Sequence, residues 1–374
     1  MAQKPNNPFV LTGYHGSAYF CDREAELDAL RDHIANDRNV VLYAWRRLGK
    51  TALLKRFIEL CEKELNMETL YVDLLATRDE EGALRQLGQA VIRRYGNTSR
   101  GLSGQLRKVL GQIGIELSFD PMTGMPTLGV GLRNETPADA SLQILGEYLI
   151  SRKKSVLVVL DEFQQITHYE GGSAEAIFRE WMQSFPDIQF IYSGSHRHMM
   201  ESMFAEANRP FYRSAQLVSL GPIALQAYES FIKSHFKAAG KTIDAKAIEG
   251  IYKWSRGQTY AIQLQCNKLY GAYNGIKGEH ITSVQTEILA QEGPVFAQYT
   301  RLLSRHQWEL LRAIAREDGV IQPMSKDFIE KSQLDAARTV TSEPKMLVQN
   351  EIVVKDDGVY LVHDLLLSRW LQTA

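Results

Sequence analysis

The fold of this chain is decided by residues 39–57, which read NVVLYAWRRLGKTALLKRF. Residues 39–44 form a short apolar run rich in β-branched side chains, which predicts a buried strand. After the loop, Leu53, Leu54 and Phe57 recur at helical spacing on one face. A strand, a glycine-containing loop and an amphipathic helix therefore follow one another, and this order is typical of a phosphate-binding loop.

The loop itself, AWRRLGKT at 44–51, matches the pattern G-x-x-x-x-G-K-[ST] except at its first position, where Ala44 stands. Gly49 lets the backbone approach a phosphate, Lys50 can reach the β- and γ-phosphates, and Thr51 can ligate Mg²⁺. A β-carbon at Ala44 is expected to strain the first turn of the loop. The residues predicted to bind nucleotide here are Ala44, Trp45, Arg46, Arg47, Leu48, Gly49, Lys50, Thr51 and Ala52.

Four further apolar runs continue the alternation of strands with helices. They are TLYVDLL (69–75), VLVVLDEF (156–163), IQFIYSGS (188–195) and QLVSLGPI (216–223). Short apolar strands of this kind predict an α/β fold, in which helices cover both faces of a parallel sheet. Residues 79–95 and 138–150 have helical patterns. Between them, alternating apolar residues on both sides of a turn predict a β-hairpin insertion at about 111–133.

Two acidic residues, Asp161 and Glu162, follow the apolar part of the third strand. The carboxyl ends of parallel strands are where α/β sheets bind ligands. We therefore predict that Asp161 holds Mg²⁺, directly or through water, and that Glu162 polarises the attacking water. An acidic pair that merely ends a strand is the alternative, and the phosphate-binding loop makes it the weaker one.

Further polar residues are candidates for sensing the γ-phosphate. Ser193 and Ser195 end the fourth strand, where a hydroxyl can lie near the carboxylates, although a plain small-residue turn explains them equally well. Arg209 and Arg213 are the best candidates for a charge-neutralising arginine, ahead of Arg197. Each arginine taken alone is also explained as a solvated surface residue. Arg213 is the arginine that we predict to be catalytic.

The remainder of the chain has a different pattern. Residues 224–290 predict several helices, with breaks near Gly240, Gly257 and residues 275–278, and no strands. From residue 299 onward, two or three short helices precede a hairpin predicted around 356–358, which is the outline of a winged helix.

Composition limits the function classes. The length of 374 residues suggests two to three domains, and 43 Lys and Arg against 44 Asp and Glu give a net charge of −1. This balance excludes a global basic field that binds nucleic acid by charge alone. The three cysteines form no paired motif, and no signal peptide or membrane-spanning run is present, so we expect a cytoplasmic protein with reduced thiols and no membrane partner.

Taken together, six segments resemble the archaeal-type ATPases, which are also found in bacteria and form a branch of P-loop NTPases close to AAA+ and STAND proteins. The segments are FCDREAEL (20–27), AWRRLGKT (44–51), VLVVLDEF (156–163), YSGSH (192–196), PFYRSAQLVSLGPI (210–223) and VYLVHDLLLSRWL (359–371). The resemblance implies a five-stranded parallel core in the order 5-1-4-3-2, a helical lid and a C-terminal winged helix. It also implies that Phe20 and Arg23 border the adenine and ribose.

The resemblance supports the same roles for Lys50, Thr51, Asp161 and Glu162, and makes Ser193 or Ser195 the sensor. Thr259 departs from it, because relatives often have proline there after a G-x pair. The domains predicted are a lead-in at 1–19, an ATPase core at 20–222, a lid at 223–298 and a winged helix at 299–374.

The function predicted is an ATP-binding, Mg²⁺-dependent ATPase that acts as a molecular switch, with its lid and winged helix responding to the nucleotide and an unidentified protein as partner. Nucleotide-modulated DNA binding is one alternative, but the candidate recognition segment 335–350 holds only Arg338 and Lys345 as basic residues. A protein-docking role for the winged helix is slightly preferred over DNA. A nucleotide-binding scaffold that does not hydrolyse ATP is the other alternative.

Overall fold

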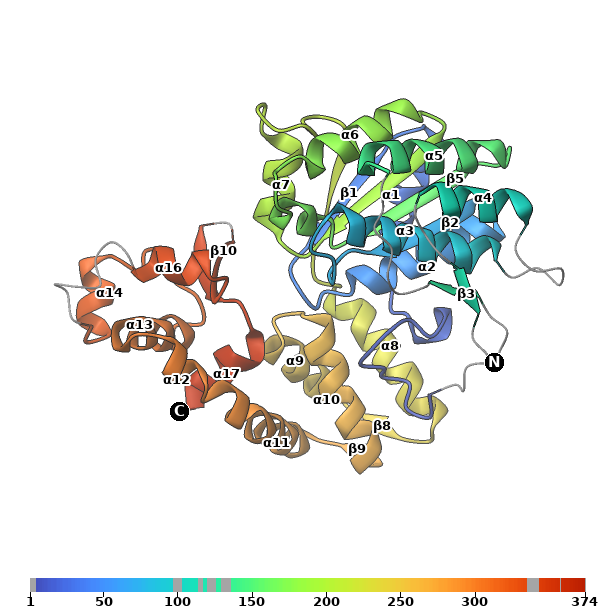
Figure 1. Ribbon diagram of the computed structural model, residues 1–374. Coiled ribbons are helices and arrows are strands. Elements are labelled where there is room, and N and C mark those ends of the chain that lie inside the picture. Colours follow the sequence, from blue (N-terminus) through green and yellow to red (C-terminus); the bar gives the residue numbers. More distant parts are fainter. Residues whose placement is uncertain are drawn as a thin grey trace. The chain divides into compact units, whose positions relative to one another are not determined.

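The computed structural model describes residues 5–96, 103–113, 117–119, 126–128, 136–334, 343–356 and 358–373 (Figure 1). The chain divides into two compact units. The first contains Thr12–Ile223, and the second contains Pro5–Leu11 together with the chain from Ala224 onward.

A five-stranded parallel sheet forms the centre of the first unit. Its strands are β1 (Val40–Ala44), β2 (Glu68–Asp73), β5 (Val156–Asp161), β6 (Ile188–Gly194) and β7 (Gln216–Leu220). They lie in the order β2-β5-β6-β1-β7, which confirms the predicted order 5-1-4-3-2. Every neighbouring pair is parallel, so the carboxyl ends of all five strands meet at one edge of the sheet.

Helices cover both faces of this sheet because alternate strand residues point to opposite sides. Val156, Val158 and Leu160 of β5 belong to one apolar cluster, whereas Leu157 and Val159 belong to another. The helices α1 (Glu24–Ala35) and α2 (Lys50–Lys63) pack on the second of these clusters. The other cluster is covered by α3 (Glu80–Tyr95), α4 (Gly104–Gln112), α5 (Ala138–Ser151), α6 (Ala174–Ser184) and α7 (Arg197–Ala205).

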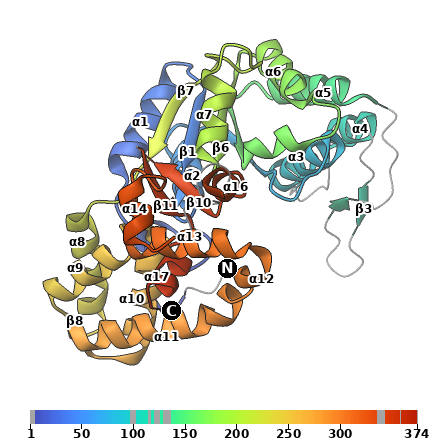
Figure 2. The same ribbon diagram turned by 90° about the vertical axis from the view of Figure 1, so that its left-hand side faces the viewer.

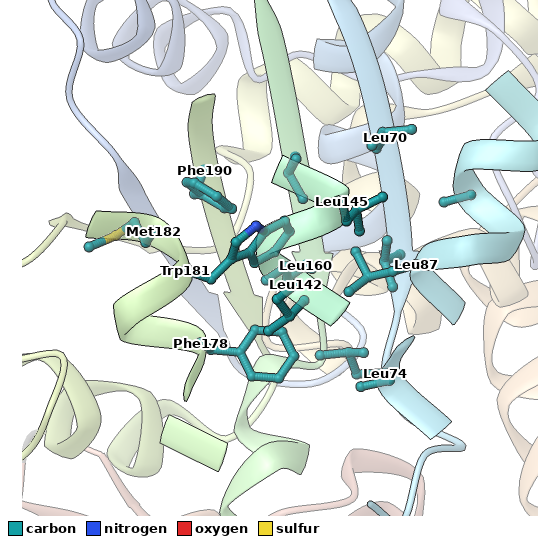
Figure 3. Packing of buried hydrophobic residues seen from close by; sticks show 14 of the residues in the cluster. Leu70, Leu74, Leu87, Leu142, Leu145, Leu160, Phe178, Trp181, Met182 and Phe190 are labelled. Atoms are coloured by element: carbon teal, nitrogen blue, oxygen red, sulfur yellow. The ribbon is translucent and has the colours of Figure 1, made fainter. Parts of the chain in front are cut away.

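The apolar cluster covered by α3 to α7 is filled mostly by large side chains. Figure 3 shows Leu142, Leu145 and Trp181 directed from α5 and α6 toward the strands that carry Leu160 and Phe190. Two 3₁₀ helices, η1 (Ser17–Tyr19) and η2 (Phe163–His168), complete the first unit. The second of these follows β5 directly and therefore lies beside the end of the sheet that carries Asp161.

Two short strands, β3 (Leu117–Phe119) and β4 (Pro126–Leu128), pair antiparallel in the segment where the sequence predicts a hairpin. The predicted turn between them lies outside the described residues. The preceding helix α4 has no counterpart in the sequence prediction. Ser103 caps it by accepting a hydrogen bond from the Leu106 N–H, and it buries Leu106, Val109 and Leu110.

The second unit begins with the helices α8 (Leu225–Ala238), α9 (Ala245–Trp254), α10 (Thr259–Ala272), α11 (Gly278–Phe296) and α12 (Tyr299–Leu302). The prediction that this region contains no strands was wrong, because β8 (Thr242–Ile243) and β9 (Gly275–Ile276) form a parallel pair. Strands of two residues are too short to leave an alternating pattern in the sequence.

Part of the N-terminal lead-in is anchored in this second unit. The Phe9 side chain is 1% exposed and lies against the rings of Phe231, Phe236 and Tyr270. Asn267 Nδ2 donates to the Phe9 carbonyl at 2.7 Å. This burial differs from the loose segment that the polar composition of residues 1–19 suggests, because one aromatic side chain suffices to anchor a short segment.

The C-terminal part of the second unit contains α13 (Arg305–Arg316), α14 (Lys326–Lys331), α16 (Glu343–Gln349), β10 (Val353–Asp356), β11 (Val359–Val362) and α17 (Leu365–Thr373). Figure 2 shows α13, α14 and α16 gathered around the β10–β11 hairpin. Val320 adds a single antiparallel bridge to Tyr360. Of the predicted recognition segment 335–350, only residues 343–350 are described. No helix in the described part of the chain combines the length and apolarity needed to cross a lipid bilayer.

Candidate nucleotide-binding site

The loop between β1 and α2 begins without the strain expected at Ala44. Ala44 is the last residue of β1, is 1% exposed and pairs with Leu220 of β7. It is not among the described non-glycine residues with positive φ. The first position of the motif therefore still belongs to the sheet, where a β-carbon is ordinary, and that expectation was wrong.

The turn of the loop occurs nearer to α2. Arg47 has φ 68° and Gly49 has φ 91°, so both adopt left-handed backbone conformations. Gly49 is also the N-cap of α2. Left-handed residues within a turn direct successive N–H groups into a concave surface, and the N-terminus of a helix adds a positive partial charge. This backbone geometry fits a phosphate group.

A buried carboxylate lies beside the loop. Asp161, at the end of β5, is 2% exposed, and its Oδ1 is bound by Lys50 Nζ and by Ser193 Oγ, the latter at 2.8 Å. Its Oδ2 accepts from Tyr71 OH at 2.8 Å and from Thr51 Oγ1 at 3.1 Å. Four side-chain donors from α2, β2 and β6 therefore converge on one carboxylate, and the Glu162 N–H adds a fifth at 3.0 Å.

These donors keep Asp161 ionised. Burial by itself disfavours the charged form, but the Lys50 ammonium and the hydroxyls of Ser193 and Tyr71 outweigh it and hold the pKa of Asp161 below its usual value. The same environment acts oppositely on Tyr71, because burial and the nearby Asp161 charge raise the pKa of this phenol. Tyr71 therefore remains a neutral donor to Asp161.

A second cation, Lys55, flanks this cluster. Lys55 Nζ lies 2.9 Å from the centre of the Tyr71 ring. Burial lowers the pKa of Lys55 to about 8. A hollow of about 580 Å³ beside it is lined by Lys55, Tyr71, Asp73 and Arg93, among others, from α2, β2 and α3.

Glu162 lies next to Asp161 in an unusual backbone conformation, with φ 54°. Its Oε2 accepts from Gln164 Nε2 at 2.6 Å, from Ser195 Oγ at 2.8 Å and from the Ser195 N–H at 3.3 Å. Its Oε1 lies 3.4 Å from Lys50 Nζ. The two serines at the end of β6 thus divide their contacts, since Ser193 meets Asp161 and Ser195 meets Glu162.

A residue of the segment before α1 contacts the backbone of the loop. The Arg23 side chain is 3% exposed, and its Nη2 donates to the Leu48 carbonyl at 3.0 Å while its Nη1 binds Glu26 at 2.6 Å. Phe20 and Trp45 pack against the cluster between α1, α2 and the sheet. Arg23 therefore braces the loop through its backbone. Whether Phe20 and Arg23 also border a nucleotide stays a prediction.

Four other predicted arginines contact residues outside the Asp161 cluster. Arg46 Nη2 is 3.2 Å from His196 Nε2. Arg209 forms an ion pair of 2.7 Å with Glu175 of α6, and Arg197 one of 3.1 Å with Glu201 of α7. Arg213 is exposed, with φ 53°, and its guanidinium lies 5.1 Å from the centre of the Tyr212 ring. The catalytic role of Arg213 therefore stays a prediction.

Two residues of the site, Tyr71 and Gln164, belong to no motif of the sequence. Tyr71 lies within an apolar strand, and Gln164 follows the acidic pair. The strand order contains the signal for Tyr71, because β2 and β5 are neighbours and Asp73 is paired with Asp161. Tyr71 and Asp161 lie two register positions apart on one face.

The oxygen atoms of this site fit a magnesium ion. The Thr51 hydroxyl and the ionised Asp161 carboxylate lie together at the start of α2. Mg²⁺ prefers hard oxygen ligands and takes only one or two from the protein, the others coming from water and phosphate. Among the residues that the structure describes, no cluster of three or more His, Cys, Asp or Glu side chains forms a metal site.

Two known protein families match parts of this chain. Residues 20–264 match a family described as "ATPase domain predominantly from Archaea". Residues 294–373 match a family described as "Probable winged helix domain". No curated protein matches the chain.

Several solved structures share the fold along nearly the whole chain. A Walker-type ATPase of Pyrococcus abyssi has 18% identity and a TM-score of 0.67, covering 98% of this chain and 99% of its own. The ORC2 protein of Aeropyrum pernix, solved as ADPNP–ADP complexes, has 15% identity and a TM-score of 0.60, with coverages of 99% and 98%. The Aeropyrum pernix ORC1 protein in complex with DNA has 15% identity and a TM-score of 0.52, with coverages of 98% and 96%. These likenesses establish the fold.

Proposed function

The chain belongs to the family of ATPase domains found predominantly in Archaea, and from this premise we propose that it is a magnesium-dependent, slowly turning ATPase that acts as a molecular switch. The observation that carries the proposal is the position of Lys50. Its ammonium binds Asp161 and Ser193 and lies 3.4 Å from Glu162 Oε1. One cation thus touches the proposed metal ligand, the sensor and the base.

The loop and Lys50 bind the phosphates. The backbone around Gly49 receives one phosphate, and Lys50 exchanges its contact with Asp161 for contacts to the β- and γ-phosphates. Thr51 and Asp161 hold Mg²⁺, which when bound neutralises negative charge on the phosphate oxygens. Ser193 is well placed as the sensor, because it already bonds to both Lys50 and Asp161.

Glu162 acts as the general base. Its Oε1 faces Lys50, whose ammonium binds the γ-phosphate, so a water between this carboxylate and the phosphate is oriented for attack. Arg213 is the candidate that neutralises charge as the bond to the leaving group breaks. The lid and the winged helix respond to the presence of the γ-phosphate, as in a switch of the AAA+ or STAND type, and transmit it to a protein partner.

The experiment that tests this function is single-turnover ATP hydrolysis with Mg²⁺, comparing the wild type with Glu162→Gln. We expect the variant to bind ATP normally and to hydrolyse it roughly 10² to 10⁴ times more slowly, since a general base contributes about that factor. Glu170→Gln, at an exposed glutamate that follows η2, is the matched control and should match the wild type. If the wild type binds ATP without hydrolysing it, the chain is a nucleotide-gated scaffold instead.

Nucleotide-modulated DNA binding is a second candidate, because residues 294–373 match a winged helix domain and the ORC1 relative was solved with DNA. The charge of the winged helix region argues against DNA binding. Residues 299–374 hold ten Lys and Arg against eleven Asp and Glu, whereas DNA-binding modules present a basic surface. A salt titration of duplex binding decides between them. A steep fall of affinity with salt supports DNA, and no binding at low salt removes it.

A further inference from the structure

A neighbour of Glu162 holds its carboxylate and has no role in the function proposed above. Gln164 is the second residue of η2, and its Nε2 donates to Glu162 Oε2 at 2.6 Å. Ser195 donates to the same oxygen from its Oγ at 2.8 Å and from its N–H at 3.3 Å. Three donors therefore restrain Oε2, whereas Oε1 is directed toward Lys50 Nζ at 3.4 Å.

The Gln164 side chain is itself fixed. It is 3% exposed, and a β-carbon at Gly194 would collide with its Oε1 as well as with Met200. The absence of a side chain at Gly194 thus makes room for this amide at the end of β6. The backbone of η2 is held too, because Thr167 Oγ1 donates to the Gln164 carbonyl at 2.8 Å.

We propose that Gln164 is a positioning residue for ATP hydrolysis, which clamps Glu162 Oε2 so that Oε1 faces the water that attacks the γ-phosphate. This inference rests on the proposed function and adds a residue to it. A neutral amide suits the task because it orients a carboxylate by hydrogen bonding without neutralising its charge. A lysine or arginine in the same place would form an ion pair and weaken Glu162 as a base.

Gln164→Met tests the clamp, because methionine has nearly the same length and fills the same space but cannot donate a hydrogen bond. We expect kcat for ATP hydrolysis to fall roughly 10- to 100-fold, since misplacing a catalytic group by about 1 Å costs up to that factor. The KM for ATP and the affinity for ADP should change less than about twofold, because Gln164 acts on the base and leaves the phosphate contacts intact.

Gln165→Met is the matched control. Gln165 is the next residue of the same 3₁₀ helix, and its Nε2 donates to the Thr77 carbonyl at 3.0 Å. The control therefore loses one amide donor of the same kind from the same element, without a change at Glu162. Its kcat should equal that of the wild type. Equal losses of kcat in both variants would overturn the inference, because they would reflect a general disturbance of η2.

A double-mutant cycle with Glu162→Gln separates positioning from a purely structural role. If Gln164 acts through Glu162, then Gln164→Met slows the wild type but does not slow the Glu162→Gln enzyme any further. If it slows both by the same factor, Gln164 acts independently of Glu162 and the inference is wrong. Gln164→Leu, which also lacks the donor and adds no charge beside Glu162, replaces the methionine variant in the cycle if that variant unfolds.

The outcomes also separate this inference from the function on which it rests. A wild type that hydrolyses ATP, together with a slow Glu162→Gln variant and an unimpaired Gln164→Met variant, overturns the clamp and leaves the ATPase intact. A wild type that binds ATP and does not hydrolyse it overturns both. Slow hydrolysis by Gln164→Met with unchanged KM, absent from the Gln165→Met control, establishes Gln164 as the positioning residue.

Discussion

Each of the two units contains an aspartate on which several donors converge, and the two clusters differ in the kind of donor. Asp161 in the first unit is 2% exposed and is bound by one ammonium, three hydroxyls and the backbone N–H of Glu162. Asp318 in the second unit is bound by Arg256, Arg369 and Gln372, and its side chain is 45% exposed. The first cluster is buried, and its ammonium and hydroxyl donors can rotate. The second cluster is half-exposed, and its donors are planar guanidinium and amide groups.

The difference shows what each cluster is suited to do. A lysine ammonium and hydroxyl groups can rotate to new acceptors, so the Asp161 cluster can rearrange when phosphate and Mg²⁺ arrive. Guanidinium groups bind in fixed orientations. Arg256 lies in the turn between α9 and α10, while Arg369 lies on α17 and also donates to the Trp254 carbonyl at 2.9 Å. The Asp318 cluster therefore ties the helices after residue 224 to the winged helix within the second unit.

Of the substitutions that test this contrast, Lys50→Ala should have the largest effect on ATP affinity and on stability. We expect ATP affinity to fall roughly 100-fold, because a charge-assisted hydrogen bond to phosphate contributes about 1.5–3 kcal/mol and Lys50 reaches two phosphates. The first unit should also lose roughly 3–5 kcal/mol of stability, since buried Asp161 loses its cation. Isothermal titration with ATP and thermal melting measure these two effects.

Lys63→Ala is the control for this prediction, because Lys63 ends the same helix in an exposed pair with Glu59. It should leave both ATP affinity and stability nearly unchanged. An unchanged ATP affinity in Lys50→Ala would remove the site assignment and, with it, the contrast between an exchangeable and a fixed cluster.

Asp318→Asn should have a smaller effect, confined to the second unit. Buried Arg369 would lose its charged partner, and we expect a loss of about 1–3 kcal/mol of stability. Hydrogen exchange in α9 and α17 should rise, while ATP affinity stays within about twofold of the wild type. Glu330→Gln, which breaks the exposed pair with Lys326, is the control. A loss of ATP binding in Asp318→Asn would show that the second cluster also serves the nucleotide.

The pH dependence of stability should sharpen the same contrast. Burial disfavours the ionised form of Asp318, but the hydrogen bonds and charges of Arg256 and Arg369 outweigh it and hold its pKa below the usual 3.8. The unfolded chain therefore binds this proton at a higher pH than the folded chain, so the stabilisation is present above about pH 4 and is lost as the pH falls through the lowered pKa.

Urea unfolding of the wild type and Asp318→Asn over about pH 6 to about pH 3 measures this effect. The free energy of unfolding of the wild type should fall more steeply toward acid than that of the variant. Parallel slopes would mean that Asp318 has the same pKa in the folded and unfolded chains, and would remove its cluster as a source of stability.

The sequence predicted the parts of this site that depend on local patterns. The loop 44–51 lies between its strand and helix, and parallel strands necessarily bring Asp161 and Ser193 to one edge of the sheet. The sequence does not predict the roles of Tyr71 and Gln164. These roles depend on which face of β2 is inward and on how η2 turns after β5. The sequence does not predict the Asp318 cluster either, because Arg256 and Arg369 lie 62 and 51 positions from Asp318 in the chain and share no pattern with it.

The smallest predicted effect concerns Ala44, where the sequence suggested strain that the structure does not contain. Ala44→Gly should leave ATP affinity within about twofold, because position 44 is already an extended strand residue. It should lower the free energy of unfolding by about 0.5–1 kcal/mol, since glycine within a strand loses more conformational entropy on folding.

Gly49→Ala is the opposite case, because φ 91° disfavours any β-carbon, and it should weaken ATP binding clearly. A several-fold gain in affinity from Ala44→Gly would mean that the loop has to bend at residue 44 when nucleotide binds, so that strain would arise only in the bound state.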